Sequence, residues 1–111
     1  MSDDADANLI AEILDAASRV QIYIGASGRE DFLKQDLFYD AVCMNLLRVG
    51  ECARFLGDDI KARLPNIPWP DIVSLRNRVA HSYETLKPEV LWLIASVSLP
   101  ELDKALSGLS D

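Results

Sequence analysis

Long apolar runs are missing from this sequence, and histidine and cysteine are scarce. No run reaches the roughly 18 apolar residues that a transmembrane helix requires, so no membrane span is expected. The only cysteines, Cys43 and Cys52, fall within helical patterns, so we expect reduced thiols rather than a disulfide. With His81 as the single histidine, a zinc site is poorly supported. We therefore expect neither a bound metal nor a cofactor.

The first residues, Met1 to Asp6, are acidic and lack both the positive charge and the apolar stretch of a secretory signal. A cytoplasmic protein is therefore expected. The length of 111 residues suits one domain spanning 1–111. Half of the residues are apolar, which allows a small core, and a chain of this size gains from burying a further face against a partner.

The net charge of −7 does not favour nucleic-acid binding by the protein as a whole. The charge is nevertheless uneven along the chain. Residues 48–87 carry seven Lys or Arg against five Asp or Glu, a local balance of +2, whereas both flanking segments are acidic. This imbalance alone is also typical of an ordinary solvated surface.

Apolar residues at spacings of three and four predict several amphipathic helices. The first is expected over residues 5–24, ended by Gly25 and Gly28. The second is expected over residues 31–56 and is ended by Gly57. Its apolar face is expected to be widened by Leu37, Ala41 and Met44. The stripes of these two helices are Ile10, Ile13, Ala17, Val20, Ile24 and then Phe38, Val42, Leu46, Val49, Ala53, Leu56.

Prolines mark the second half of the chain. A further helical turn is expected over residues 58–64, followed by a rigid connector with Pro65, Pro68 and Pro70. A third helix then opens at Pro70 and fades over residues 81–84, and a fourth begins near Pro88. Because Pro100 cannot occupy an undisturbed helix interior, we expect a kink or a restart at Ser98, with Ser98 and Glu101 as a capping box.

These patterns predict an all-α fold, an antiparallel bundle of four to five helices without a sheet. Periodicity alone indicates no function for such a bundle.

The informative stretch is Ser74 to Tyr83, where several kinds of hydrogen-bonding side chain crowd one helix end. Metal-independent RNA cleavage needs a group that exchanges a proton near neutral pH, which histidine provides, and fixed positive charge on the phosphate, which arginine provides. On an ideal helix Arg76 and His81 lie roughly 140° apart. A site made of both is therefore expected to need a loosened helix or a composite of two subunits. The alternative is a plain helix cap, since cations are favourable at a helix C-terminus.

Three segments within residues 31–92 together resemble the HepT-like branch of HEPN domains, the toxin halves of HEPN/MNT toxin–antitoxin pairs. Residues 40–53 contain the sequence Val-Gly-Glu-Cys-Ala of the second-helix pattern. Residues 65–69, Pro-Asn-Ile-Pro-Trp, match the connector. Residues 76–83 show Arg, four residues, His, one residue and Tyr. The order and spacing of the three segments make the resemblance specific.

The resemblance implies a homodimeric helical ribonuclease with the motifs facing a shared cleft and RNA as substrate. Arg76 and His81 would be the catalytic pair, with Arg76 on the phosphate and His81 in acid–base work. Asn77 would orient the phosphate or the histidine, or else make a helix-end hydrogen bond. Arg78 would help to bind RNA or be solvated. Tyr83 would accept AMP from a nucleotidyltransferase (MNT) antitoxin. The phosphate of the transferred AMP would repel RNA.

Two other residues of the matched segments have expected roles. Glu51 is expected to form a structural ion pair or to brace an arginine across the cleft, and Trp69 is expected to pack in the core. An alternative for the whole chain is a non-catalytic helical subunit that binds a nucleotidyltransferase and presents Tyr83 to it. The net charge favours this alternative, and the pair Arg76 and His81 favours the nuclease.

Overall fold

The computed structural model describes residues 2–35, 37–82 and 86–109. Over these ranges the protein is built from helices and contains no strand, which confirms the predicted all-α class. The elements are α1 Ser2–Leu33, α2 Leu37–Phe55, α3 Asp58–Arg63, α4 Trp69–Ser82, α5 Pro88–Leu93, the π-helix η1 Ile94–Ser98 and α6 Leu99–Gly108.

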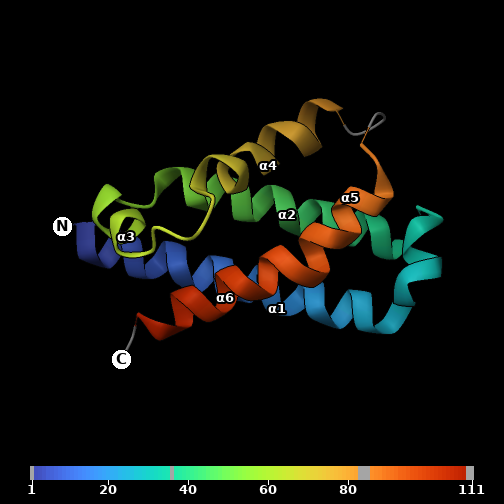
Figure 1. The fold of residues 1–111 in the computed structure, drawn as a ribbon, viewed down its shortest axis with the longest axis horizontal. Coiled ribbons are helices and arrows are strands. Elements are labelled where there is room, and N and C mark those ends of the chain that lie inside the picture. The colour runs from blue at the N-terminus through green and yellow to red at the C-terminus, as the bar shows by residue number, and fades with distance from the viewer. Residues whose placement is uncertain (1, 36, 83–85, 110–111) are drawn as a thin grey trace.

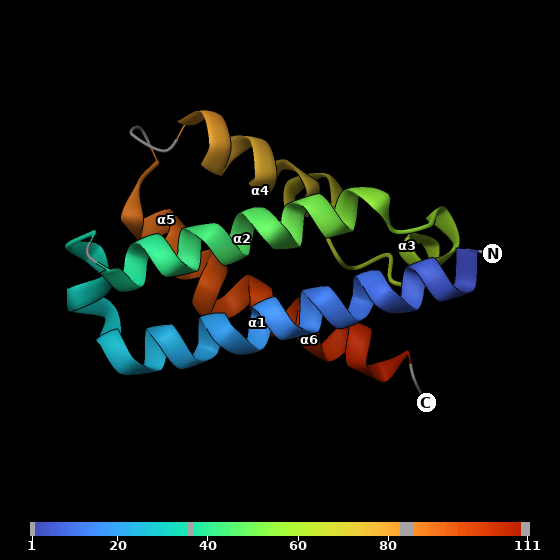
Figure 2. The same ribbon diagram turned by 180° about the vertical axis from the view of Figure 1, so that it is seen from behind.

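The helices form a bundle whose long segments alternate in direction (Figure 1). Helices α1 and α2 lie side by side and antiparallel, and α4 packs against α2. Helices α5 and α6, joined by η1, form one rod that packs along α1, as Figure 2 shows from behind. Helix α2 therefore lies between α1 and α4, and the short α3 lies at the end of the bundle near the N-terminus.

Most residues of the predicted apolar stripes form the core, whereas Ile10 and Phe38 are only half-buried. Positions at three- and four-residue spacing on α1, α2 and α4 are almost completely shielded from solvent, as the periodicity indicated. Helices α5 and α6 and the segment η1 add their own buried leucines and an alanine. The core includes Ile13, Ala17, Val20, Val42, Leu46, Val49, Ala53, Ile72, Leu75, Val79, Leu91, Ala95, Leu99, Leu102 and Leu106.

The expected end of the first helix at Gly25 is wrong. Helix α1 continues through Gly25 and breaks at Gly28, which has φ 70° and ψ 171°. Only glycine adopts this conformation without strain. The chain beyond the break stays helical to Leu33 because Phe32 inserts fully into the core, where its ring lies 5.2 Å from that of Tyr39.

The second helix starts later than predicted, at Leu37 instead of Asp31. A turn separates it from α1, with the amide of Gln35 donating to the carbonyl of Phe32 and Gln35 at φ 58°. The proposed widening of its apolar face is also wrong. Leu37 and Met44 are 76% and 65% exposed, because they lie on the side of α2 opposite the core stripe.

Pro100 disturbs the last helix in a different way from the predicted capping box. Ser98 has helical backbone angles and makes no side-chain cap. Instead the turn widens into η1, where the amide of Leu99 donates to the carbonyl of Ile94. In this register the carbonyl of Ala95 faces Pro100, which has no N–H to donate. The side-chain amide of Gln21 on α1 donates to that carbonyl at 2.9 Å and satisfies it.

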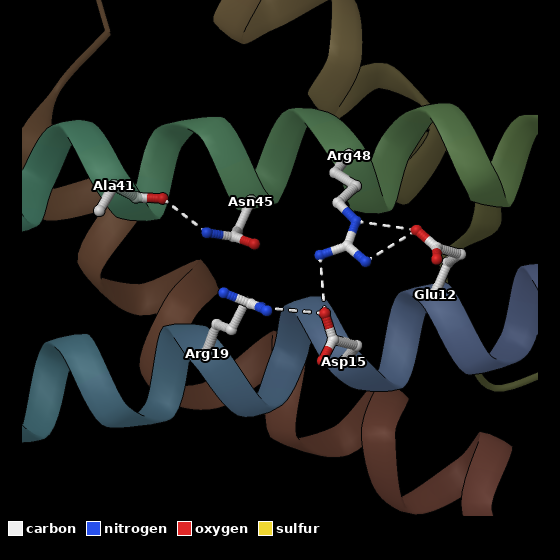
Figure 3. A network of polar contacts seen from close by, with 6 residues as sticks. All are labelled: Glu12, Asp15, Arg19, Ala41, Asn45 and Arg48. Atoms are coloured by element: carbon white, nitrogen blue, oxygen red, sulfur yellow. Dashed lines mark hydrogen bonds and ion pairs between the residues drawn. The ribbon is translucent and has the colours of Figure 1, made fainter.

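A charged seam joins α1 and α2 (Figure 3). The guanidinium of Arg48 on α2 donates to Glu12 at 2.7 Å and to Asp15 at 3.0 Å, and Arg19 donates to the same Asp15 oxygen at 2.9 Å. Hydrogen bonds from Arg19 and then Arg48 lower the pKa of the Asp15 carboxyl. Arg48, one of the basic residues of segment 48–87, is thus already engaged by carboxylates.

Two further expectations concern thiols and membranes. Both cysteines are free, and burial raises the pKa of the Cys43 thiol to about 11, which keeps it protonated and unreactive at neutral pH. Among the described residues, no helix is both long and apolar enough to cross a bilayer.

Candidate active site

Helix α4 carries the informative stretch and is anchored on one side. Its buried residues Ile72, Leu75 and Val79 pack into the core, so the opposite side is presented to solvent. Its first residue, Trp69, is buried, and the indole N–H donates to the carbonyl of Leu64 at 3.1 Å. The predicted packing role of Trp69 is thus confirmed, and it fixes where the helix begins.

Arg76 and His81 meet on the outer side of this helix. Nη1 of Arg76 lies 3.5 Å from Nε2 of His81, although α4 stays helical through Ser82. The expectation that such a site needs a loosened helix or a second subunit is therefore wrong. The long arginine side chain spans the angular separation and the rise of five residues within one chain.

The chemistry of the contact constrains the imidazole. A guanidinium can only donate hydrogen bonds, so the contact is a hydrogen bond when Nε2 carries a lone pair and the ring proton sits on Nδ1. In this tautomer Nε2 is a base that faces a fixed cation. Both side chains are open to solvent, with Arg76 half-buried and His81 exposed, so a polyanionic substrate can reach them.

Asn77 acts on the arginine. Its side-chain oxygen accepts a hydrogen bond from Nη1 of Arg76 at 3.0 Å. The sequence reasoning considered the phosphate, the histidine or the helix end as the target of Asn77, and missed Arg76. Adjacent residues on a helix do not normally face each other, so spacing gives no signal for this pair.

Arg78 lies apart from this pair. It lines a groove of about 260 Å³ between α4 and the rod of α5 and η1, together with Asp71, Ile72 and Val90 among others. The structure therefore places two arginines of the motif on different flanks of α4. Arg76 lies toward α2, and Arg78 lies toward α5.

Helix α2 approaches the site through Gly50 and Glu51. A Cβ atom at Gly50 would come within 2.5 Å of the backbone nitrogen of Arg76, so the two helices touch here at backbone level. The next residue, Glu51, places Oε1 at 3.7 Å from Nε of Arg76. The expected ion pair of Glu51 is thus present, within one chain. The role of Gly50 was missed, although a glycine inside a helical pattern is itself a signal of close packing.

Tyr83, the expected AMP acceptor, lies outside the described residues. Within the described residues, no three histidine, cysteine, aspartate or glutamate side chains gather in a way that could hold a metal ion. The site that the structure brings together therefore consists of Arg76, Asn77, His81 and Glu51.

Comparison with known proteins gives a consistent picture. The sequence matches the family described as "Ribonuclease HepT-like" over residues 13–109. A relative from Methanocaldococcus jannaschii, named "Putative RNase MJ1380", is 29% identical over 93 residues, which cover 84% of this chain and 85% of the relative. A relative from Thermococcus cleftensis, named "Probable ribonuclease HepT", is 27% identical over 93 residues, which cover 84% of each chain.

No solved structure matches the chain at a significant level. The family match spans most of the sequence, including the whole of α2 and α4 and hence every residue of the site. This chain belongs to the HepT-like ribonuclease family.

Proposed function

We propose that this chain is an endoribonuclease that cleaves RNA without a metal ion, with Arg76 and His81 as its catalytic pair. The observation that carries the proposal is the 3.5 Å contact between Nη1 of Arg76 and Nε2 of His81 on the solvent-facing side of α4. It puts a proton acceptor next to a permanent cation, which are the two groups that this reaction needs. The names of the relatives, which refer to RNase activity, support it.

The proposed step is an attack by a ribose 2′-hydroxyl on the adjacent phosphate. Nε2 of His81 gives up its contact with Nη1 of Arg76 and accepts the hydroxyl proton. The 2′-oxygen forms a bond to phosphorus, and the bond from phosphorus to the 5′-oxygen breaks. The products are a 2′,3′-cyclic phosphate and a 5′-hydroxyl end. Arg76 stabilises the extra negative charge on the non-bridging oxygens as the five-coordinate phosphorus forms.

The departing 5′-oxygen needs a proton, and a homodimer supplies a source. With two copies of His81 at one cleft, a neutral imidazole accepts the proton of the nucleophile and a protonated imidazole of the partner subunit donates to the leaving oxygen. We therefore propose that the chain forms a homodimer with the two α4 helices near the two-fold axis.

An exposed apolar stripe on α2 supports this dimer. Leu37, Met44 and Glu51 follow one another at intervals of seven residues and so share a face of α2, and Phe55 lies four residues further on the same face. Leu37, Met44 and Phe55 are all more than half exposed in the single chain. Because Glu51 is paired with Arg76, the stripe borders the site, and covering it with a second copy would bring two sites together.

The proposed biological role is that of the toxin in a HEPN/MNT pair, silenced when a nucleotidyltransferase antitoxin transfers AMP to Tyr83. Membership in the HepT-like family supports this role. Tyr83 follows His81 by two residues, so an added phosphate would bring negative charge to the catalytic centre and repel RNA.

The second candidate is a non-catalytic subunit that binds a nucleotidyltransferase, which the net charge of −7 favours. One experiment separates the two. Purified protein is incubated with RNA in the presence of a chelator, beside Arg76→Ala and His81→Ala. If the chain is a nuclease, the wild type cleaves RNA and both variants retain only a weak residual activity, lower by at least about 100-fold. Absence of cleavage by the wild type at any concentration would favour the binding subunit.

A further inference from the structure

The glycine of α2 determines where the two site helices touch. A Cβ atom at Gly50 would lie 2.5 Å from the backbone nitrogen of Arg76, 3.1 Å from the carbonyl oxygen of Ile72 and 3.1 Å from Cβ of Leu75. No other residue type fits there without moving a helix. The closest approach of α2 to α4 therefore occurs at the residue that carries the proposed catalytic cation.

The carboxylate of Glu51 enters the site from this point of contact. Its Oε1 atom is buried and accepts no hydrogen bond from the described residues, and it lies 3.7 Å from Nε of Arg76. Apart from this oxygen the two side chains are largely open, 42% exposed in each case, and 3.7 Å is too long for a hydrogen bond, so the ion pair contributes little to stability. A buried carboxylate oxygen directed at one nitrogen is better explained by its effect on that nitrogen's orientation.

The guanidinium of Arg76 is held on two of its three nitrogens. Nε faces Glu51, and Nη1 contacts the oxygen of Asn77 and the ring of His81. Among the described residues, Nη2 has no partner. Since the group is planar and rigid, contacts at Nε and Nη1 fix the direction in which Nη2 points.

We infer that Glu51 is a positioning residue, which holds the Arg76 guanidinium in the plane that presents Nη2 to the scissile phosphate. This inference rests on the proposed function and deepens it. Glu51 touches neither substrate nor reacting atoms, and it acts through Arg76 alone. A preoriented donor costs no reorganisation when charge develops on the phosphate, so its effect appears in the chemical step.

The inference predicts that loss of the negative charge of Glu51 slows cleavage, which is opposite to the expected effect of that charge on RNA binding. Removing a carboxylate next to an RNA site makes the surface less negative, which by itself would favour RNA binding. Glu51→Gln should instead lower kcat by about 10- to 100-fold, the size of the loss when a residue that orients a metal-binding side chain is removed. KM should stay within about threefold, because RNA contacts are spread over many groups. Glu51→Asp keeps the charge on a shorter side chain, so its kcat should lie between that of the wild type and that of Glu51→Gln.

Two comparisons separate positioning from a structural role. In the Arg76→Ala background, Glu51→Gln should change kcat by less than about twofold, because its only target is gone. The matched control is Glu12→Gln, which removes the same charge from the ion pair that joins α1 to Arg48 of α2, and kcat should be unchanged. The Nε–H resonance of Arg76 should shift in Glu51→Gln and stay in place in Glu12→Gln, which should move that of Arg48.

The outcomes are distinguishable. If the wild type cleaves RNA and His81→Ala does not, while Glu51→Gln matches the wild type, the inference is overturned and the proposed function stands. An equal loss of kcat from Glu51→Gln with and without Arg76 would also overturn it, as would an unmoved Arg76 resonance. Wild-type protein that never cleaves RNA would overturn the proposed function and the inference together.

Discussion

Gly50 and Arg76 touch at backbone level, with the position of a Cβ atom on Gly50 only 2.5 Å from the amide nitrogen of Arg76. An added methyl group must push α4 away from α2, because backbone atoms cannot yield as a flexible side chain can. Gly50→Ala should therefore lower the free energy of unfolding by about 1–3 kcal/mol, the usual cost of overpacking. Urea denaturation followed by circular dichroism measures this change.

Gly25 provides the matched control. It is also a glycine inside a helix, but a Cβ atom there would meet nothing within 4 Å. Gly25→Ala should raise the free energy of unfolding by about 0.5–1 kcal/mol, since alanine favours the helix. Equal stabilisation by both substitutions would show that α2 and α4 are not in close contact at Gly50.

The bond between Gln21 and the carbonyl of Ala95 should be worth a measurable amount. Gln21→Ala leaves that carbonyl without a donor, because Pro100 cannot supply one. The expected loss is about 1–3 kcal/mol in the free energy of unfolding. Pro100→Ala restores a backbone N–H in the turn, so Gln21→Ala should cost less in that background. A cost that is the same in both backgrounds would contradict the link between Gln21 and Pro100.

The sequence predicted the helix types and the core stripes because apolar spacing reports directly which side of a helix is buried. It placed the start of α2 and the end of α1 wrongly, because Phe32 is drawn into the core from beyond a glycine break. It missed the π-helix, because the partner of the displaced Ala95 carbonyl is Gln21, far away in the chain.

The sequence named the four residues that the structure brings together, Arg76, Asn77, His81 and Glu51, but it misjudged their geometry and also named Arg78, which lies apart from them. On an ideal helix Arg76 and His81 lie on different sides. The helical projection gives only the directions of the Cβ atoms, however, and the arginine side chain is long enough to reach around the helix. The contact of Asn77 with Arg76 has no signature in spacing. The ion pair of Glu51 was expected from the family resemblance, whereas the close approach of α2 to α4 was missed, and Gly50 was the sign of it in the sequence.

The proposed dimer predicts a strong effect of a charge on the stripe of α2. Met44→Asp would bury a carboxylate without a partner at the interface and should raise the dimer dissociation constant by at least about 100-fold. RNA cleavage should fall with it. Val97→Asp alters another exposed apolar residue, on η1, away from the stripe, and should leave the dimer intact. Light scattering at micromolar concentration measures the mass, and a monomeric wild type would refute the dimer.

If AMP on Tyr83 silences the proposed nuclease, Tyr83→Phe should escape the proposed nucleotidyltransferase antitoxin. Phenylalanine keeps the ring and removes the hydroxyl that would accept AMP, so this variant should cleave RNA and stay active when co-expressed with a nucleotidyltransferase. Tyr23 and Tyr39 lie within α1 and α2 and serve as controls. Mass spectrometry should find AMP on Tyr83 alone. An adduct on Tyr23 or Tyr39, or full inhibition of Tyr83→Phe, would point to direct occlusion of the cleft.

The chemistry at His81 is the central claim, and the ends of the cleaved RNA test it most directly. Wild-type protein is incubated with a short RNA in excess chelator, and the fragments are weighed by mass spectrometry beside those from His81→Ala. The account predicts a 5′ fragment with a 2′,3′-cyclic phosphate, lighter by one water than the linear phosphate, and a loss of cleavage by at least about 100-fold in the variant. Cleavage that survives His81→Ala, or that stops when the chelator is added, would contradict it.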